Sequence, residues 1–174
     1  DFVSGDPDYN GATYYVANDG NGRDADAVEA LNDRAFGPGR FTKSSERVRE
    51  FAEFRPDLSF CAWSDGDMVG TVRMWRVRIG DREAVFLGPL AVNAEARKLG
   101  AGGALVEAAS RASAAAGFPL VLLVGDEPYF ARFGYASAKT GKVRMPGPVD
   151  QRRVLALELR PGGADGLAGP VGPA

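Results

Sequence analysis

Apolar residues recur at two different spacings along the first ninety residues, and these spacings predict helices followed by strands. The stretches 25–35 and 42–54 carry apolar residues three and four positions apart, which predicts two amphipathic helices. A short β-rich run at 13–17 precedes them and predicts a strand. Three longer β-rich runs, LSFCAW, MVGTVRMWRVRI and AVFLGPLAV, follow with glycine-containing turns between them. Strands joined by such turns predict an antiparallel meander.

The second half of the chain alternates between helical and extended patterns. An alanine-rich segment opens after residue 100 and ends at Gly117, a residue type that commonly follows a helix. The run PLVLLVG after it is apolar throughout, which indicates a strand buried on both faces. A strand, a helix and a strand in succession predict a right-handed crossover between parallel strands. A short helix over 126–135 and two further strands, GKVRM and RRVLALEL, complete the pattern.

These elements predict a single α/β (α+β) domain over residues 13–160, with a mixed, mostly antiparallel sheet flanked by helices. The length of 174 residues fits one such domain. Residues 1–12 are polar and rich in glycine, and residues 161–174 are rich in glycine, proline and alanine. We expect the first segment to be a flexible arm and the second to be a flexible tail.

One predicted strand contains a residue pair that strands avoid. Gly88-Pro89 interrupts AVFLGPLAV, where proline removes a ladder donor and glycine weakens strand packing. Such a pair marks either a bulge, often found beside a functional site, or a simple kink in an edge strand. The local sequence leaves both interpretations open.

Charge and composition exclude several classes of function. The formal net charge of −2 gives no general attraction to nucleic acid or to an anionic membrane surface. Histidine is absent, which excludes Ser-His-Asp and Cys-His nucleophiles and histidine metal ligands, so we expect no metal site. The single cysteine, Cys61, cannot form an intrachain disulfide, which favours a reducing, cytoplasmic location. The longest apolar run is too short to cross a bilayer, and no signal-peptide pattern opens the chain.

The segment ARKLGAGG, residues 96–103, places three glycines at the start of the alanine-rich helix. Backbone N–H groups at a helix start bind anions, and glycine lets the backbone approach a phosphate closely. The segment lacks the Gly-Lys-Ser/Thr of a Walker loop and the glycine spacing of a dinucleotide fingerprint. Taken alone, Arg97, Gly100 and Gly102 fit a structural turn as well as a phosphate site. Their place inside a βαβ unit favours the phosphate site.

The stretch LGPLAVNAEARKLGAGGALVEAA resembles the central motif of the GNAT superfamily of N-acetyltransferases, Q/R-x-x-G-x-G/A. The segments FGPGR, VRIG, VLLVGD, YFARFGY and PGPVDQRRVLALEL extend the likeness to the YhbS-like branch of that superfamily. The resemblance covers about residues 24–159, and the family has the same order of elements. It implies the GNAT fold, with a bulged sheet, acetyl-CoA as the donor at the central βαβ unit and an amine as the acceptor.

The resemblance also implies which residues contact the donor. The backbone of Leu99–Gly103 would hold its pyrophosphate, and the strand after Gly88-Pro89 would pair with its pantetheine chain. The backbone amide of Leu90 would stabilise the thioester oxygen during the reaction. The residues expected to contact the donor are Leu90, Ala91, Val92, Arg97, Lys98, Leu99, Gly100, Ala101, Gly102, Gly103, Phe130 and Arg132.

The position from which the family often protonates the leaving thiolate holds Phe130 here, four residues before Gly134. Three interpretations stay open: Tyr129 supplies the proton, solvent supplies it, or catalysis is impaired. The first two make the chain an N-acetyltransferase, and the third makes it a weak or inactive acyl-CoA-binding or sensor module. Asp126 and Glu127 are candidate bases, although we favour a helix cap for Asp126 and a surface charge for Glu127.

Arg73, Arg76 and Arg78 alternate along one predicted strand. We expect them on the solvated face of a half-buried sheet, with an acidic acceptor or the 3′-phosphate of CoA as the alternative partner. The sequence leaves open which amine is the acceptor, on a small molecule or on a protein. It also leaves open whether the chain is a monomer or a homodimer.

Overall fold

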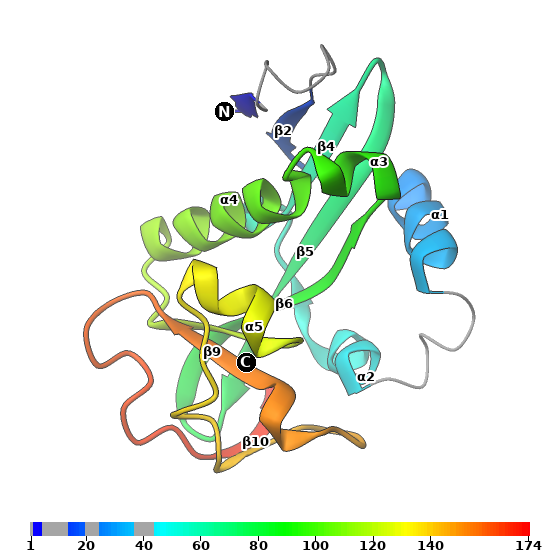
Figure 1. Cartoon of the computed structure of the whole chain (residues 1–174). Helices are drawn as coiled ribbons and strands as arrows, with labels where there is room; N and C mark the ends of the chain where they lie inside the picture. The colour runs from blue at the N-terminus through cyan, green and yellow to red at the C-terminus, as the bar shows by residue number, and fades with distance from the viewer. Residues whose placement is uncertain (1, 5–13, 20–24, 37–43) are drawn as a thin grey trace.

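The computed structural model describes residues 2–4, 14–19, 25–36 and 44–174 (Figure 1). Its helices are α1 (Ala25–Phe36), α2 (Ser44–Phe51), α3 (Ala94–Lys98), α4 (Ala101–Ala115) and α5 (Glu127–Phe130), with 3-10 turns η2 (Pro56–Leu58), η3 (Ala131–Phe133) and η4 (Gln151–Arg153). Its strands are β1 (Phe2–Ser4), β2 (Tyr15–Asn18), β3 (Glu53–Phe54), β4 (Phe60–Ser64), β5 (Asp67–Ile79), β6 (Arg82–Val92), β7 (Leu120–Val124), β8 (Val143–Arg144), β9 (Val154–Glu158) and β10 (Gly169–Pro173).

The described strands form one sheet in the order β1-β2-β4-β5-β6-β7-β9, with β3, β8 and β10 pairing off this path. Neighbours along the path are antiparallel except for β6 and β7, which α4 connects in parallel. Figure 1 shows α4 on one side of β5 and β6 and the helices α1 and α2 on the other side. The predicted mixed, mostly antiparallel sheet with a central βαβ unit is therefore confirmed.

Strand β5 separates two apolar clusters because its side chains alternate between the two faces of the sheet. Val72 and Met74 belong to the cluster beneath α4, and Trp75 belongs to the cluster on the α2 side. Leu105 of α4 packs over Gly70, where an added Cβ would lie 2.9 Å from the Leu105 Cδ1 atom. The absence of a side chain at Gly70 thus allows α4 to lie close to the sheet.

The predicted bulge lies in β6 at Gly88-Pro89, a pair joined by a cis peptide bond. Leu87 pairs with Met74 and Leu90 pairs with Val72, so three residue steps on β6 face two steps on β5. Strand β6 lies between β5 and β7 rather than at an edge. The bulge interpretation is therefore confirmed, and the alternative of an edge-strand kink is wrong.

Strands β6 and β7 run together for only two residue pairs, Val85 with Val121 and Phe86 with Leu122. Strand β6 continues to Val92 but forms no further ladder pair with β7. The two strands therefore part where the bulge begins, and beyond that point no strand of the described residues pairs with the β7-facing edge of β6.

The C-terminal segment 161–174 is ordered, which corrects the prediction of a flexible tail. It ends in β10, which pairs antiparallel with β5 (Val171 with Ile79) and parallel with β8. The Arg82 guanidinium donates to the carbonyl oxygens of Gly163 and Asp165 at 2.7 and 2.6 Å. A Gly- and Pro-rich composition signals disorder only where no apolar residue is buried, and Ala164, Leu167 and Val171 are all buried.

At the other end of the chain, Phe2–Ser4 pairs with β2 as an edge strand. The predicted flexible arm, residues 1–12, otherwise lies outside the described residues.

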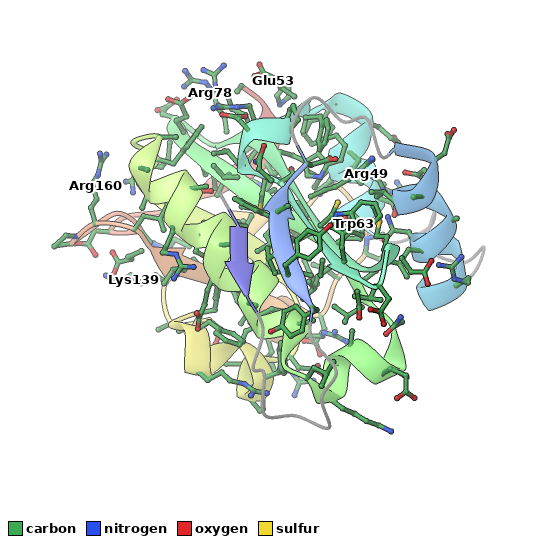
Figure 2. The ribbon with its side chains drawn as sticks, turned by 90° about the horizontal axis from the view of Figure 1, so that it is seen from above. Arg49, Glu53, Trp63, Arg78, Lys139 and Arg160 are labelled. Carbon is green, nitrogen blue, oxygen red and sulfur yellow. The ribbon has the colours of Figure 1, made fainter. Side chains whose placement is uncertain are left out.

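The buried position of Val171 gives a test of the ordered C-terminus. Replacing Val171 with Ala removes two methyl groups from a cluster that includes Ile79, so the free energy of unfolding should fall by roughly 1–3 kcal/mol. Urea denaturation followed by circular dichroism measures this change. The control is Arg160→Ala, which removes an exposed side chain that points away from the molecule (Figure 2) and should leave stability unchanged. A flexible tail would make the two variants equally stable.

Candidate functional site

A cavity of about 900 Å³ opens where β6 leaves β7, between the start of α4, the α5–η3 segment and α1. Its wall combines strand backbone, the glycine segment, aromatic rings and four basic or acidic side chains. The lining residues are Leu31, Arg34, Leu90, Ala91, Val92, Asn93, Ala94, Arg97, Gly100, Gly102, Gly103, Ala104, Glu107, Tyr129, Arg132 and Phe133.

The turn between α3 and α4 exposes the start of α4. The side chain of Asn93 accepts a hydrogen bond from the Ala96 N–H at 2.8 Å and begins α3, which lasts five residues. Gly100 then adopts φ 84°, a left-handed conformation that turns the chain into α4. The N-cap residue Gly100 has no side chain to cap α4, so the first N–H groups of α4 have neither an intrahelical acceptor nor a side-chain cap from that position. An uncapped start of a 15-residue helix in a cavity wall is suited to an anion.

Two glycines in the first turn of α4 face aromatic rings from the α5–η3 segment. A Cβ on Gly102 would lie 2.8 Å from the Tyr129 Oη atom, and one on Gly103 would lie 2.9 Å from the Phe133 Cζ atom. Tyr129 and Phe133 themselves contact edge-to-face, with ring centroids 5.6 Å apart. A side chain at either position would therefore contact one of these rings, and glycine also leaves the first turn of α4 uncovered.

Most of the predicted donor-binding residues meet in this cavity. Those in the wall are Leu90, Ala91, Val92, Arg97, Gly100, Gly102, Gly103 and Arg132, and the candidate proton donor Tyr129 lies in the same wall. Lys98 is exposed outside the wall, whereas Leu99 and Ala101 pack toward the core cluster under α4. Any role of Leu99 and Ala101 in donor binding therefore rests on their backbone.

Tyr129 and Phe130 point in different directions from the short helix α5. Tyr129 lines the cavity, and the Arg132 guanidinium lies 4.5 Å from the centre of its ring. Phe130 lies outside the wall and packs on the core, at 5.9 Å from the Tyr135 ring centre and directly against Gly125. Tyr129 and Phe130 differ because about 100° of helix rotation separates neighbouring side chains. Phe130 has a packing role here, and its contact with the donor stays a prediction.

Glu127 is engaged in holding the loop after η3. Its two carboxylate oxygens accept hydrogen bonds from the Ser137 hydroxyl and backbone N–H at 2.8 and 2.9 Å. These bonds lower the pKa of Glu127, the backbone bond most strongly, so the carboxylate stays ionised and both of its oxygens are engaged by Ser137. Asp126 occupies the N-cap position of α5, yet its carboxylate makes no capping hydrogen bond and lies 3.5 Å from Arg153. Neither carboxylate lines the cavity.

The three alternating arginines of β5 have different environments, which corrects the prediction of one solvated face. Arg76 pairs with Glu83 at 2.6 Å, and Arg78 is exposed at the edge of the molecule (Figure 2). Arg73 is only 7% exposed, because α1 covers it and places Glu29 at 3.4 Å from its guanidinium. Burial lowers the pKa of Arg73, and the neighbouring positive charge of Arg49 lowers it further. Arg73 lies three residues before Arg76, so strand alternation places the two side chains on opposite faces of β5, and residue spacing carried no information on what covers either face.

Several lining residues were not predicted from the sequence. Asn93 follows a strand and precedes a helix, which is an N-cap signal that could have placed it at the cavity. Leu31 and Arg34 come from α1. Glu107 and Phe133 come from helical segments whose sequence pattern predicts only an ordinary surface or core position. Nothing local links α1 to the end of β6, so those residues required the tertiary structure.

Within the described ranges, no cluster of three or more His, Cys, Asp or Glu side chains is arranged to hold a metal ion. No helix of the described chain is long and apolar enough to cross a membrane.

Known proteins are similar to this chain in sequence and in fold. The uncharacterized N-acetyltransferase YjhQ of Escherichia coli (strain K12) is 30% identical over 132 residues, which cover 72% of this chain and 71% of that protein. The crystal structure of the GNAT family N-acetyltransferase YhbS from Escherichia coli in complex with CoA is 25% identical, with a TM-score of 0.72 over 92% of this chain and 88% of that chain. A GNAT family acetyltransferase from Brucella melitensis in complex with acetyl-CoA is 23% identical, with a TM-score of 0.64 over 91% and 94% of the two chains.

A family model matches the chain from the start of α1 to Tyr135, the residue that follows Gly134 at the end of η3. Residues 25–135 match the model of the Acetyltransferase (GNAT) family, and this range contains the bulged strand, the bare start of α4 and the α5–η3 segment. Because the match spans more than half of the chain and includes most of the cavity wall, this chain belongs to the GNAT family of N-acetyltransferases.

Proposed function

We propose that this protein moves the acetyl group of acetyl-CoA to an amine of a small molecule or protein by direct attack. The observation that carries the proposal is one cavity that joins the uncapped start of α4 to the unpaired edge of β6. The likeness to YhbS, whose crystal structure is a complex with CoA, supports the choice of donor. The buried thiol of Cys61, the single cysteine of the chain, is consistent with a reducing compartment, and we infer a cytoplasmic location.

The donor's phosphates suit the start of α4. The first N–H groups of α4 point along the helix axis into a wall that also contains Arg97 and Arg132. These two guanidinium groups add positive charge beside the helix dipole, and together they favour a dianionic pyrophosphate. Arg132 stacks on Tyr129 and Phe133, which restricts its side chain before any ligand arrives.

The pantetheine chain suits the open edge of β6. Leu90, Ala91 and Val92 keep their pairing with β5 while their other edge has no partner on β7. An extended chain with two amides can pair with such an edge as an added strand does. We assign the Leu90 N–H to the thioester oxygen, where one fixed donor stabilises the negative charge that develops in the transition state.

The reaction then needs one bond to form and one to break. The neutral amine nitrogen attacks the thioester carbon, the C–S bond breaks, and the nitrogen loses a proton as the amide forms. The thiolate takes up a proton from Tyr129, which is the phenol in the cavity wall, or from water. Glu107 is the one carboxylate among the lining residues, and it lies a turn beyond the glycines of α4. We therefore assign removal of the amine proton to water.

One observation favours a second candidate function. Phe130 occupies the position from which the family often donates a proton, and its ring is turned into the core. A protein of this kind that binds acyl-CoA and turns it over weakly or not at all would act as a binding or sensor module. Thiol release measured over a panel of polyamines, aminoglycosides, amino acids and peptides separates the two functions. Turnover above the buffer rate on any amine rejects the sensor, whereas binding of acetyl-CoA without turnover on any amine rejects the enzyme.

The glycine segment gives a test of donor binding. Gly102→Glu should weaken CoA binding by about a hundredfold or more, since bulk and negative charge would both meet the pyrophosphate, and like charges in contact cost several kcal/mol. Isothermal titration with CoA measures the affinity. Gly141→Glu is the matched control, because it adds the same charge at an exposed glycine with open space around it. Equal affinity in the two variants would place the phosphate site elsewhere.

The hydroxyl of Tyr129 gives a test of the proton donor. Tyr129→Phe keeps the ring that packs beside Phe133 but removes the acid, so kcat should fall by roughly tenfold or more while the KM for acetyl-CoA changes little. Steady-state thiol release on the best amine measures both constants. Tyr15→Phe, on the half-exposed tyrosine of β2, serves as the control. An unchanged kcat in Tyr129→Phe would transfer the role of acid to solvent.

A further inference from the structure

The carbonyl group of Gly88 has no partner in the strand ladders on either side of β6. On the β5 side the paired residues are Leu87 and Leu90, and the two residues between them are looped out. On the β7 side the pairing ends at Phe86. Buried backbone carbonyls without a partner are rare, because each loses its bonds to water without gaining others. The bulge therefore needs a hydrogen-bond donor from outside the ladders.

Trp75 of β5 supplies that donor. Its indole Nε1–H donates to the Gly88 carbonyl oxygen at 2.7 Å, and the bond is buried. The residue itself is 7% exposed, and this bond satisfies an indole N–H that would otherwise be buried without an acceptor. Each group thus depends on the other for its hydrogen bond.

The Trp75 ring is held in place by groups from two other elements. The Arg49 guanidinium of α2 lies 5.2 Å from the centre of the ring, and the Phe54 ring of β3 lies at 5.0 Å. Arg49 is in turn fixed by ion pairs to Glu46 and to Glu29 of α1, at 2.9 and 3.0 Å. The direction of the indole N–H is therefore set by α1, α2 and β3 together, and through it the direction of the Gly88 carbonyl.

We propose that Trp75 is a positioning residue for acetyl transfer: its indole holds the β6 bulge in the shape that presents the Leu90 N–H to the thioester. Trp75 is not among the cavity-lining residues and acts only through the backbone between Gly88 and Leu90. This inference rests on the proposed function, because it assumes that the Leu90 amide meets the thioester oxygen. The alternative role, an aromatic residue that merely fills the α2-side cluster, needs the ring but not its N–H.

The substitution Trp75→Phe separates the two roles, because it keeps an aromatic ring beside Arg49 and removes the N–H. A misplacement of about 1 Å at a reacting group can cost up to a hundredfold in rate, so we expect kcat to fall by about tenfold or more. The affinity for CoA should stay unchanged, since CoA has no thioester and its phosphates bind at α4. Trp63→Phe is the matched control: it makes the same change at the other tryptophan of the chain, which is half-buried on β4 away from the bulge (labelled in Figure 2).

A spectroscopic measurement reports the positioning without any turnover. Acetyl-CoA labelled with ¹³C at the acetyl carbonyl should show a downfield shift on binding to the wild type and to Trp63→Phe, because the carbonyl accepts a hydrogen bond. On Trp75→Phe the signal of the bound ligand should return toward that of free acetyl-CoA. A second variant, with β-(3-benzothienyl)alanine at position 75, keeps the bicyclic shape without the N–H and should behave in the same way.

Each outcome decides for or against the proposal. Loss of kcat and of the ¹³C shift with CoA affinity retained, in either variant at position 75, is the expected result. Turnover and a ¹³C shift equal to those of Trp63→Phe would overturn it, and so would a parallel loss of CoA affinity, which would mean that Trp75 supports the whole sheet. If the wild type shows the ¹³C shift but acetylates no amine, the proposed function fails while the positioning by Trp75 is still read from the shift.

Discussion

The two edges of strand β6 differ in their hydrogen bonding, and the rest of the site depends on this difference. The strand must stay in the sheet through β5, and it must also leave its other edge free where the donor is proposed to bind. The bulge at Gly88-Pro89 reconciles these demands by shifting the register against β5 just after the last pair with β7. The hydrogen bond from Trp75 supplies the partner that the bulge removes from the Gly88 carbonyl. The open edge of β6 follows from the bulge, and in our proposal the hydrogen bond from Trp75 sets the position of the Leu90 amide.

The start of α4 and the α5–η3 segment form the opposite wall as a single packed unit. Tyr129 and Phe133 lie directly over Gly102 and Gly103, so the rings determine how closely α5 approaches α4. The same absence of side chains keeps the first N–H groups of α4 open to the cavity. A substitution at Gly102 or Gly103 would therefore disturb both ligand binding and the packing of Tyr129 and Phe133, which explains why two glycines occur together there.

Helices α1 and α2 connect to this site through a half-buried ionic cluster. Glu29 of α1 pairs with Arg49 and lies near Arg73, and Arg49 covers the indole of Trp75. Buried ion pairs add little net stability, because desolvation offsets their attraction, but they hold groups in one arrangement. Here the arrangement links the two helices to the bulge in β6. The two helices thus support β6, and α1 also contributes Leu31 and Arg34 to the cavity wall.

The sequence by itself determined the order of the central elements, the parallel β6–β7 connection and the glycine segment at the start of α4, and it marked Gly88-Pro89 as either a bulge or a kink. These features are local: a Gly-Pro pair, a left-handed glycine and a helix start impose their backbone conformations wherever they occur. The tertiary structure alone decided that Phe130 packs inward while Tyr129 faces the cavity, that Arg73 is buried under α1, and that the C-terminal segment pairs with β5. It alone brought Trp75 to Gly88. Each of these depends on what covers a given face, and residue spacing carries no information on a partner that lies far away in the chain.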